Sequence, residues 1–261
     1  MKPDYKNWVP KGMLAGFAAG LAAALALLLI SLFVLPEGLL HTILLAMSAV
    51  AAVILLAATL WLTMMHRAFS YNGKRQLAKA IVEGTAAYIS IPDGGTGLDV
   101  GCGSGALTIA CAKRNPRARM IGIDRWGKEY ASFNKSLCEQ NARAENVSNT
   151  SFQQGNALHL DFPDESFDAV TSNYVYHNIT GADKQDCLRE TLRVLKKGGA
   201  FALHDIMSKS RYGDMEAFAA QLRAEGYERV ELIDTTNGMF MSRKEAVLMD
   251  LSGSTLLVGR K

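Results

Sequence analysis

The chain has 261 residues and a formal net charge of +3 at pH 7. This length suffices for one complete α/β domain with an appendage, and so small a charge argues neither for nor against nucleic-acid binding. The cysteines form no Cys-x-x-Cys pair and no cluster with histidine; they are Cys102, Cys111, Cys138 and Cys187. Their spacing argues against a metal site or a disulfide framework and favours a reducing, cytosolic environment.

Two long uncharged runs open the chain, at residues 13–35 and 39–65. The first would form a helix of about 35 Å, longer than the ~30 Å hydrocarbon core of a bilayer, and the second is also long enough to span. Residues 36–38 between them leave room only for a tight turn. We therefore expect residues 1–66 to form a transmembrane helical hairpin.

Two other interpretations of these runs are weaker. A cleaved signal peptide has a shorter apolar region and is not followed at once by a second span. A helical hairpin in a soluble core has a polar face, whereas both runs are apolar all round.

The charges that flank the runs predict an orientation. Only Glu37 lies in the turn, whereas cations flank both outer ends: Lys2, Lys6, Lys11, Arg67, Lys74, Arg75 and Lys79. The positive-inside rule then places both termini and the domain that follows on the cytoplasmic side of a membrane, in contact with its lipids.

Gly12, Gly16 and Gly20 recur every four residues and form a small-residue face. This face could support a homodimer contact or close packing against the second helix of the same hairpin. The short turn forces the second contact to exist, so we favour it.

Residues 67–94 mix charges with helical apolar spacing and predict an amphipathic linker or lid. Tyr71 lies where this pattern is interrupted. It is a candidate substrate-binding lid residue, although an interfacial tyrosine explains it equally well.

Residues 96–105, Thr-Gly-Leu-Asp-Val-Gly-Cys-Gly-Ser-Gly, predict a buried strand and a glycine turn, and a helix over 106–114 follows. This arrangement is typical of nucleotide-binding folds, because glycines permit positive φ and the helix N-terminus presents N–H groups. A dinucleotide pattern, Gly-x-Gly-x-x-Gly/Ala, fits loosely. Asp99 precedes the first glycine by two residues, which disfavours a pyrophosphate and suits a cationic ligand.

The sequence LDVGCGSG resembles the first motif of the class I S-adenosylmethionine-dependent methyltransferases. The resemblance implies an α/β domain over residues 95–261, with a seven-stranded, mostly parallel Rossmann-like sheet flanked by helices and closed by an antiparallel strand. It implies S-adenosylmethionine as cofactor, S-adenosylhomocysteine as product and no metal. It further implies cofactor contacts from the motif residues Asp99, Gly101, Cys102, Gly103 and Gly105.

Two more groups of residues are candidates for cofactor binding. Asp124 follows a strand predicted at 119–123, about twenty residues after the glycine turn, where a carboxylate reaches paired ribose hydroxyls; it could also cap a helix predicted over 127–142. Arg125 and Trp126 come next, and Trp126 could cover an adenine face or simply pack. Asn156 and Ala157 follow a strand predicted at 150–154, where the family binds the adenine edge.

Polar and aromatic residues gather where the next two strands end. Asn173, a candidate cofactor contact, ends the predicted strand 169–173 and precedes further candidates: Tyr174 and Asn178 for substrate, Tyr176 and His177 for catalysis. His204 and Asp205 follow the strand predicted at 200–203 as substrate-binding candidates, because ligands bind at the carboxyl ends of such strands. His177 could be a general base or only a pocket wall.

Three functions are compatible with these features. We favour a membrane-anchored methyltransferase acting on a small or lipid-like acceptor by in-line displacement. A nucleotide-dependent oxidoreductase and a non-catalytic membrane scaffold that retains the fold are the alternatives. No motif indicates a nucleic-acid partner, and the acceptor itself cannot be inferred, because fold and cofactor do not determine substrate.

Overall fold

The structure is a computed structural model that describes residues 2–127 and 132–261. The chain divides into two compact units. One, the hairpin unit, is Asn7–Ala78. The other, the sheet unit, comprises residues 2–6 and Lys79–Lys261, so the sheet unit holds both ends of the described chain.

The hairpin unit contains the two apolar helices, α1 (Lys11–Phe33) and α2 (Leu39–Phe69). Both are long and apolar enough to cross a membrane by length and composition. Many of their large apolar side chains are exposed, with Phe33 at 80% and Leu39 at 79%. These helices therefore bury little of their own apolar surface within the chain.

Contacts inside the hairpin unit join its two helices. A Cβ added to Gly20 would lie 3.6 Å from the Leu55 side chain of α2, whereas nothing described lies within 4 Å of the same position on Gly12 or Gly16. Near the chain ends of the hairpin, Asn7 Nδ2 donates to the carbonyl oxygen of His66 at 2.8 Å. Gly20 thus packs within the hairpin, and the homodimer contact stays a prediction.

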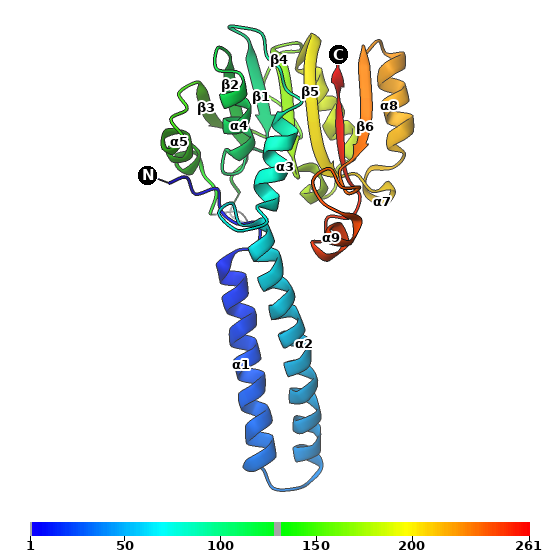
Figure 1. The fold of residues 1–261 in the computed structure, drawn as a ribbon. Coiled ribbons are helices and arrows are strands. Elements are labelled where there is room, and N and C mark those ends of the chain that lie inside the picture. Colours follow the sequence, from blue (N-terminus) through cyan, green and yellow to red (C-terminus); the bar gives the residue numbers. More distant parts are fainter. Residues whose placement is uncertain (1, 128–131) are drawn as a thin grey trace. The chain divides into compact units, whose positions relative to one another are not determined.

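The sheet unit is a seven-stranded sheet with the order β3-β2-β1-β4-β5-β7-β6 (Figure 1). The strands are β1 (Thr96–Val100), β2 (Arg119–Asp124), β3 (Thr150–Gln154), β4 (Phe167–Asn173), β5 (Leu195–Ile206), β6 (Arg229–Asp234) and β7 (Ser254–Arg260). The first five strands are parallel, and β7 runs antiparallel to both of its neighbours. The predicted mostly parallel sheet with a closing antiparallel strand is confirmed.

Helices pack against both faces of the sheet. The described helices after the hairpin are α3 (Leu77–Ala86), α4 (Ala106–Arg114), α5 (Lys135–Ala144), α6 (Lys184–Arg193), α7 (Lys209–Tyr212), α8 (Met215–Ala224) and α9 (Arg243–Leu248). Side chains alternate along each strand, so Phe201 and Leu203 of β5 share one core with α6 and α8. Ala200 and Ala202 face the other core, with α3 and α4.

One helix prediction differs from the structure. The helix predicted over 127–142 lies partly outside the described residues, and α5 begins at Lys135. Further along, α6 ends at Arg193, and the Lys-Lys-Gly-Gly segment that follows belongs to β5 and forms no helix cap. The side chain of Lys261 instead donates to the carbonyl of Leu192 at 2.9 Å, a contact with the distant C-terminus that local sequence cannot indicate.

A substitution at Gly259 tests how closely the antiparallel strand β7 packs against its neighbours. A Cβ at this position would lie 1.8 Å from the carbonyl oxygen of Arg229 and 2.6 Å from the Phe201 ring. We expect Gly259→Ala to lower the free energy of unfolding by about 3 kcal/mol, because it forces β6 from β7 and overpacks the core. Gly12→Ala, at an open helical position, should change it by less than about 1 kcal/mol. Denaturant titration in mild detergent would measure the free energy of unfolding of both variants. Equal decreases in the two variants would contradict the close pairing of β6 with β7 at Gly259.

Candidate active site

A glycine loop connects β1 to α4 and lies at the centre of the predicted site. Gly101, Gly103 and Gly105 have φ angles of 74°, 54° and 81°, in the region that favours glycine. The backbone N–H groups of Gly101 and Cys102 donate to the carbonyl oxygen of Ile123 in β2, at 2.8 and 2.9 Å. The predicted loop residues therefore lie together at the carboxyl end of β1.

Close neighbours explain why two of these positions are glycine. A Cβ on Gly101 would lie 2.3 Å from the Val175 side chain, so the segment that follows β4 lies directly against the loop. A Cβ on Gly105 would lie 3.0 Å from the ring of Phe152. Among the residues that the structure describes, none lies closer than 3.9 Å to the same position on Gly103, so no described side chain crowds this part of the loop.

Asp124 ends β2 next to the loop. Its Oδ2 accepts a hydrogen bond from the Gly103 N–H at 2.9 Å, and its Oδ1 accepts one from the Trp126 N–H at 2.8 Å. Each carboxylate oxygen can accept a second hydrogen bond. Asp124 can therefore bind a pair of hydroxyl groups while it holds the loop.

Trp126 also contacts the loop. Its backbone has a φ of 44°, and its indole Nε1 donates to the Gly103 carbonyl at 3.1 Å. Arg125 is exposed, and its carbonyl accepts a hydrogen bond from Gln154 Nε2 at 3.2 Å. The cofactor-binding roles of Arg125 and Trp126 stay predictions.

Asn156 and Ala157 lie just beyond β3. Asn156 is exposed, and its Oδ1 accepts the N–H of Leu158 at 3.1 Å, which stabilises a local turn. Ala157 is partly buried against the core. Their contact with an adenine edge stays a prediction.

Asp99 requires a correction. It is 1% exposed, and its carboxylate accepts hydroxyl hydrogen bonds from Thr108 at 2.6 Å and Thr171 at 3.0 Å. Burial raises the pKa of Asp99 to about 7, although both threonines oppose the shift. The group thus supports β1 and α4 from inside the fold, rather than contacting a cationic ligand directly as predicted.

His177 and Asp205 form a hydrogen-bonded pair where β4 and β5 end. His177 Nδ1 lies 2.5 Å from Asp205 Oδ1, and Oδ2 accepts the N–H of Tyr176 at 2.8 Å. Burial alone would raise the pKa of Asp205, but the hydrogen bonds from His177 and from the Ile206 N–H hold it below its ordinary value.

The ionised Asp205 therefore determines the chemistry of His177. An ionised carboxylate can only accept, so it holds the imidazole proton on Nδ1 and leaves Nε2 as the basic nitrogen. Among the residues that the structure describes, none is hydrogen-bonded to His177 Nε2, and the His177 side chain is 15% exposed. The two predicted candidates, one catalytic and one substrate-binding, thus come together as a single unit.

Tyr176 also requires a correction. It is 1% exposed and belongs to the hydrophobic core. Its hydroxyl donates to Thr191 Oγ1 at 2.6 Å, since the Thr191 hydroxyl itself donates to the Cys187 carbonyl at 3.2 Å. Burial raises the pKa of Tyr176 well above its ordinary value. The catalytic role predicted for Tyr176 is replaced by a packing role.

Tyr174 lies beside His177 and presents its ring. The ring centroids of Tyr174 and His177 are 5.9 Å apart, and those of Tyr174 and His204 are 4.7 Å apart. Its hydroxyl lies 2.6 Å from Ser254 Oγ, which itself donates to the Leu251 carbonyl at 2.6 Å. A φ of 56° at Tyr174 is uncommon for a bulky residue and typical of functional sites.

His204 is a buried structural residue rather than the predicted substrate contact. Its Nε2 lies 3.0 Å from Thr235 Oγ1, and its Nδ1 lies 2.9 Å from the Asn173 amide. Burial lowers the pKa of His204 to about 3, so the ring is neutral. Because the Asn173 atom that faces Nδ1 is the amide oxygen, which can only accept, the neutral ring carries its proton on Nδ1, and its Nε2 faces the Thr235 hydroxyl.

Two predicted substrate residues remain, Asn178 and Tyr71. Asn178 is exposed at the end of the 3-10 turn Tyr176–Asn178, and its Nδ2 donates to the Tyr174 carbonyl at 3.4 Å. Tyr71 belongs to the hairpin unit, so its lid role stays a prediction.

Three residues at the loop were not predicted to contribute. Val175 packs on Gly101, Cys138 Sγ donates to the Gly103 carbonyl at 3.2 Å, and Asn141 Nδ2 donates to the Ser104 carbonyl at 3.0 Å. The spacing of three places Cys138 and Asn141 on one face of α5. Sequence indicates that shared face but not the carbonyl groups it meets.

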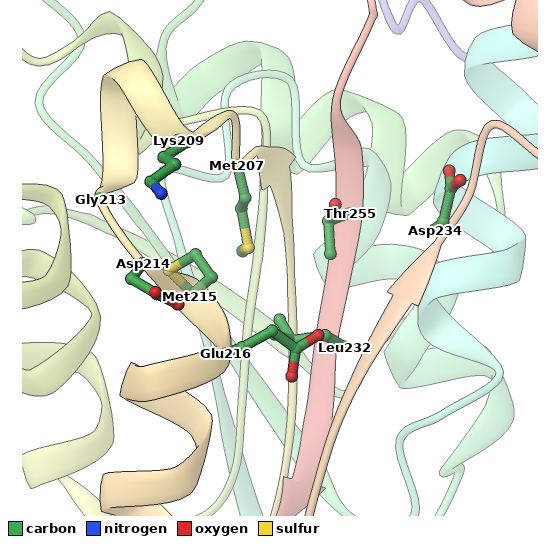
Figure 2. Close-up of a pocket in the computed structure, with 9 residues that line it drawn as sticks. All are labelled: Met207, Lys209, Gly213, Asp214, Met215, Glu216, Leu232, Asp234 and Thr255. Atoms are coloured by element: carbon green, nitrogen blue, oxygen red, sulfur yellow. The ribbon is translucent and has the colours of Figure 1, made fainter.

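A groove of about 360 Å³ lies elsewhere at the ends of β5 and β6 (Figure 2). Lys209, Asp214, Glu216 and Asp234 place charges around its sulfur-rich wall. Asp214 already accepts the N–H of Ala217 at 3.0 Å as the N-cap of α8. None of the predicted site residues lines this groove.

Comparison with known proteins identifies the family. A family model described as a methyltransferase domain matches residues 91–238. The chain belongs to the methyltransferase family. Its antiparallel β7 agrees with the class I, S-adenosylmethionine-dependent members, and the dinucleotide oxidoreductase interpretation is set aside.

Two curated methyltransferases illustrate how far the similarity extends. The demethylmenaquinone methyltransferase of Lactobacillus johnsonii is 38% identical over 112 residues, which cover 42% of this chain and 43% of the relative. That of Bacillus licheniformis is 31% identical over 139 residues, covering 53% and 56%. The chain thus spans about half the length of these relatives.

A solved structure, that of the [4+2]-cyclase SpnF, is similar in fold to this chain. It aligns with a TM-score of 0.55 and 21% identity, over 72% of this chain and 82% of that chain. At this identity the likeness concerns the fold alone.

The methyltransferase family implies S-adenosylmethionine, and the residues present fit it. The cofactor needs a close backbone approach, which Gly103 allows, and an acceptor for ribose hydroxyls, which Asp124 offers. A carboxylate at this position also disfavours a phosphate group on electrostatic grounds.

Asp99 provides a pH test of the burial described above. Its pKa of about 7 in the folded protein exceeds the ordinary 3.8, so its contribution to stability is present below pH 3.8 and is lost as the pH rises through 7. From pH 5 to pH 8 we expect the free energy of unfolding to fall by about 2 kcal/mol more in wild type than in Asp99→Asn.

Denaturant titrations at both pH values would measure this difference. Asp161→Asn, at an exposed carboxylate, is the matched control and should keep the wild-type slope. An unchanged slope in Asp99→Asn would show that this carboxyl ionises normally.

Proposed function

We propose that this protein is a membrane-anchored, S-adenosylmethionine-dependent methyltransferase that acts on a small lipophilic acceptor. The observation that carries the proposal is the His177–Asp205 pair beside the glycine loop. Val175 packs directly on Gly101, and His177 follows two residues later, so the base and the cofactor loop belong to one site.

Cofactor binding is assigned to the glycine loop and Asp124. The cofactor supplies a methyl group on a positively charged sulfonium, which needs no metal and no further activation. The loop backbone allows close approach, Asp124 binds the ribose hydroxyls, and Trp126 and Asn156 border the adenine.

His177 acts as the general base toward the acceptor. Asp205 orients the imidazole through Nδ1–H and stabilises the positive charge that develops when Nε2 takes a proton. The acceptor proton moves to Nε2 as its hydroxyl or ring carbon becomes nucleophilic. The remaining task of the protein is alignment in a site from which water is excluded.

A quinol-type aromatic ring is the acceptor that the site favours. The Tyr174 ring lies beside His177, and aromatic rings stack against or pack edge-on to planar ligands. The two curated relatives described above are both named demethylmenaquinone methyltransferases. Such acceptors are apolar and partition into bilayers.

The hairpin unit would anchor the enzyme where such an acceptor resides. Its helices have the length and composition of spans, and the cations that flank them favour both ends, and hence the sheet unit, on the cytoplasmic side. Residues 67–94 with Tyr71 would then cover the acceptor at the interface.

Asp124 tests cofactor binding. We expect Asp124→Ala to weaken S-adenosylhomocysteine binding at least about 30-fold, because two charge-assisted hydrogen bonds to the ribose are lost. Isothermal titration of the full chain in detergent would measure the affinity. Asp161→Ala should bind as wild type does, and wild-type affinity in Asp124→Ala would refute the assigned cofactor site.

His177 tests the assigned chemistry. With a short-chain naphthoquinol acceptor, His177→Ala should lower kcat by about 10²- to 10⁴-fold, because the general base is lost. S-Adenosylhomocysteine affinity should stay within about twofold, since His177 is not assigned to cofactor binding. Asp205→Asn should also lower kcat, because the wrong imidazole tautomer is favoured.

His159→Ala removes an exposed histidine and should leave turnover unchanged. If His177→Ala turned over like wild type, His177 would be a pocket wall. If the wild-type protein bound the cofactor but neither it nor any variant methylated the quinol, the proposed acceptor class would be wrong.

A further inference from the structure

Residues 2–6 belong to the sheet unit although they precede the hairpin in the chain. The chain leaves the sheet unit after Lys6 and returns at Lys79. The N-terminal segment lies beside α5 (Figure 1). The hairpin is therefore an insertion tied to the sheet unit at both of its ends, which the sequence pattern had not predicted.

Asn141 of α5 connects this segment to the glycine loop. Its Oδ1 accepts the N–H of Asp4 at 2.7 Å, and its Nδ2 donates to the Asp4 carbonyl at 3.0 Å. The same Nδ2 donates to the Ser104 carbonyl at 3.0 Å. Ser104 is the residue between Gly103 and Gly105, so one side chain links the N-terminus to the loop.

The geometry of this amide leaves no alternative orientation. Turning the amide over would place its NH2 against the Asp4 N–H and its oxygen against two carbonyls. Asn141 is 1% exposed, and a buried amide that loses its partners is costly. The bridge is therefore specific and depends on the N-terminal segment for two of its three hydrogen bonds.

Further contacts hold the segment on α5. The Tyr5 hydroxyl donates to Glu145 Oε1 at 3.1 Å, and Tyr5 is 9% exposed. Glu145 also pairs with Lys113 of α4. Asp4 Oδ1 accepts the N–H of Lys6 at 3.1 Å, and Lys6 has a φ of 56°, so the chain turns sharply where the hairpin unit begins.

The carbonyl that Asn141 holds sets part of the loop conformation. A peptide group is planar, so fixing the Ser104 C=O also directs the Gly105 N–H, which donates to the Cys102 carbonyl at 2.7 Å. The neighbouring Gly103 C=O accepts from Cys138 of α5. The carbonyls of Gly103 and Ser104 thus both bond to α5, and no described side chain crowds a Cβ position on Gly103.

We propose that residues 2–6 act as a strap that, through Asn141, holds the glycine loop in its cofactor-binding conformation. The strap ends where the chain leaves the sheet unit for the hairpin. A displacement of the strap at that point would therefore change the affinity for the cofactor. The cofactor part rests on the proposed function, whereas the coupling between strap and loop does not. Asn141 is a positioning residue, since it acts on the cofactor only through the loop backbone.

Three variants of the full chain in detergent test the strap. Asn141→Ala removes the bridge, and Tyr5→Ala releases the strap while leaving Asn141 in place. Asn149→Ala is the matched control, because Asn149 Nδ2 likewise donates to three backbone carbonyls, those of Ala112, Asn115 and Ala118, away from the glycine loop.

The first readout is hydrogen exchange of the loop amides without ligand. We expect exchange in the loop to be roughly tenfold faster in both Asn141→Ala and Tyr5→Ala, and unchanged in Asn149→Ala. Wild-type exchange in Tyr5→Ala would overturn the strap even if Asn141→Ala failed to fold.

The second readout is the affinity for S-adenosylhomocysteine. The affinity should weaken roughly tenfold in Asn141→Ala. In the double variant Asn141→Ala/Tyr5→Ala it should weaken by less than the product of the two single effects, because both substitutions act through the same Asn141 bridge. Full additivity would overturn the coupling. Absence of binding in wild type would refute the methyltransferase proposal, while the exchange measurement would still decide the strap.

Discussion

The parallel register of β1, β4 and β5 is the constraint on which the site depends. Val100 pairs with Ser172, and Asn173 pairs with His204, so these three strands end at the same edge of the sheet. That common edge brings together the glycine loop, His177 and Asp205, which are far apart in the sequence. The antiparallel β7 lies between β5 and β6.

Local sequence patterns predicted those parts of the candidate site that directly follow the end of a strand. The glycine loop and Asp124 were found because a glycine turn and an acidic residue directly follow apolar strands. Asp99 was misassigned because side chains alternate along β1, which turns its carboxylate toward Thr108 and not toward the open side of the loop.

Other features could not be predicted from local sequence. Tyr176 and His177 are adjacent, yet the 3-10 turn sends one side chain to Thr191 in the core and the other to Asp205. Lys261 contacts the end of α6, and Asp4 contacts Asn141, each across a long stretch of chain. Such contacts depend on the tertiary arrangement, and no spacing rule indicates them.

The account's central claim is that this edge of the sheet binds a methyl donor beside a base. An experimental structure of the full chain in a lipid bilayer mimic with S-adenosylhomocysteine tests it most directly. We expect the ribose hydroxyls to lie within hydrogen-bond distance of Asp124 and the sulfur to face His177 Nε2. Density for the ligand away from the glycine loop, or a loop closed to it, would contradict the account.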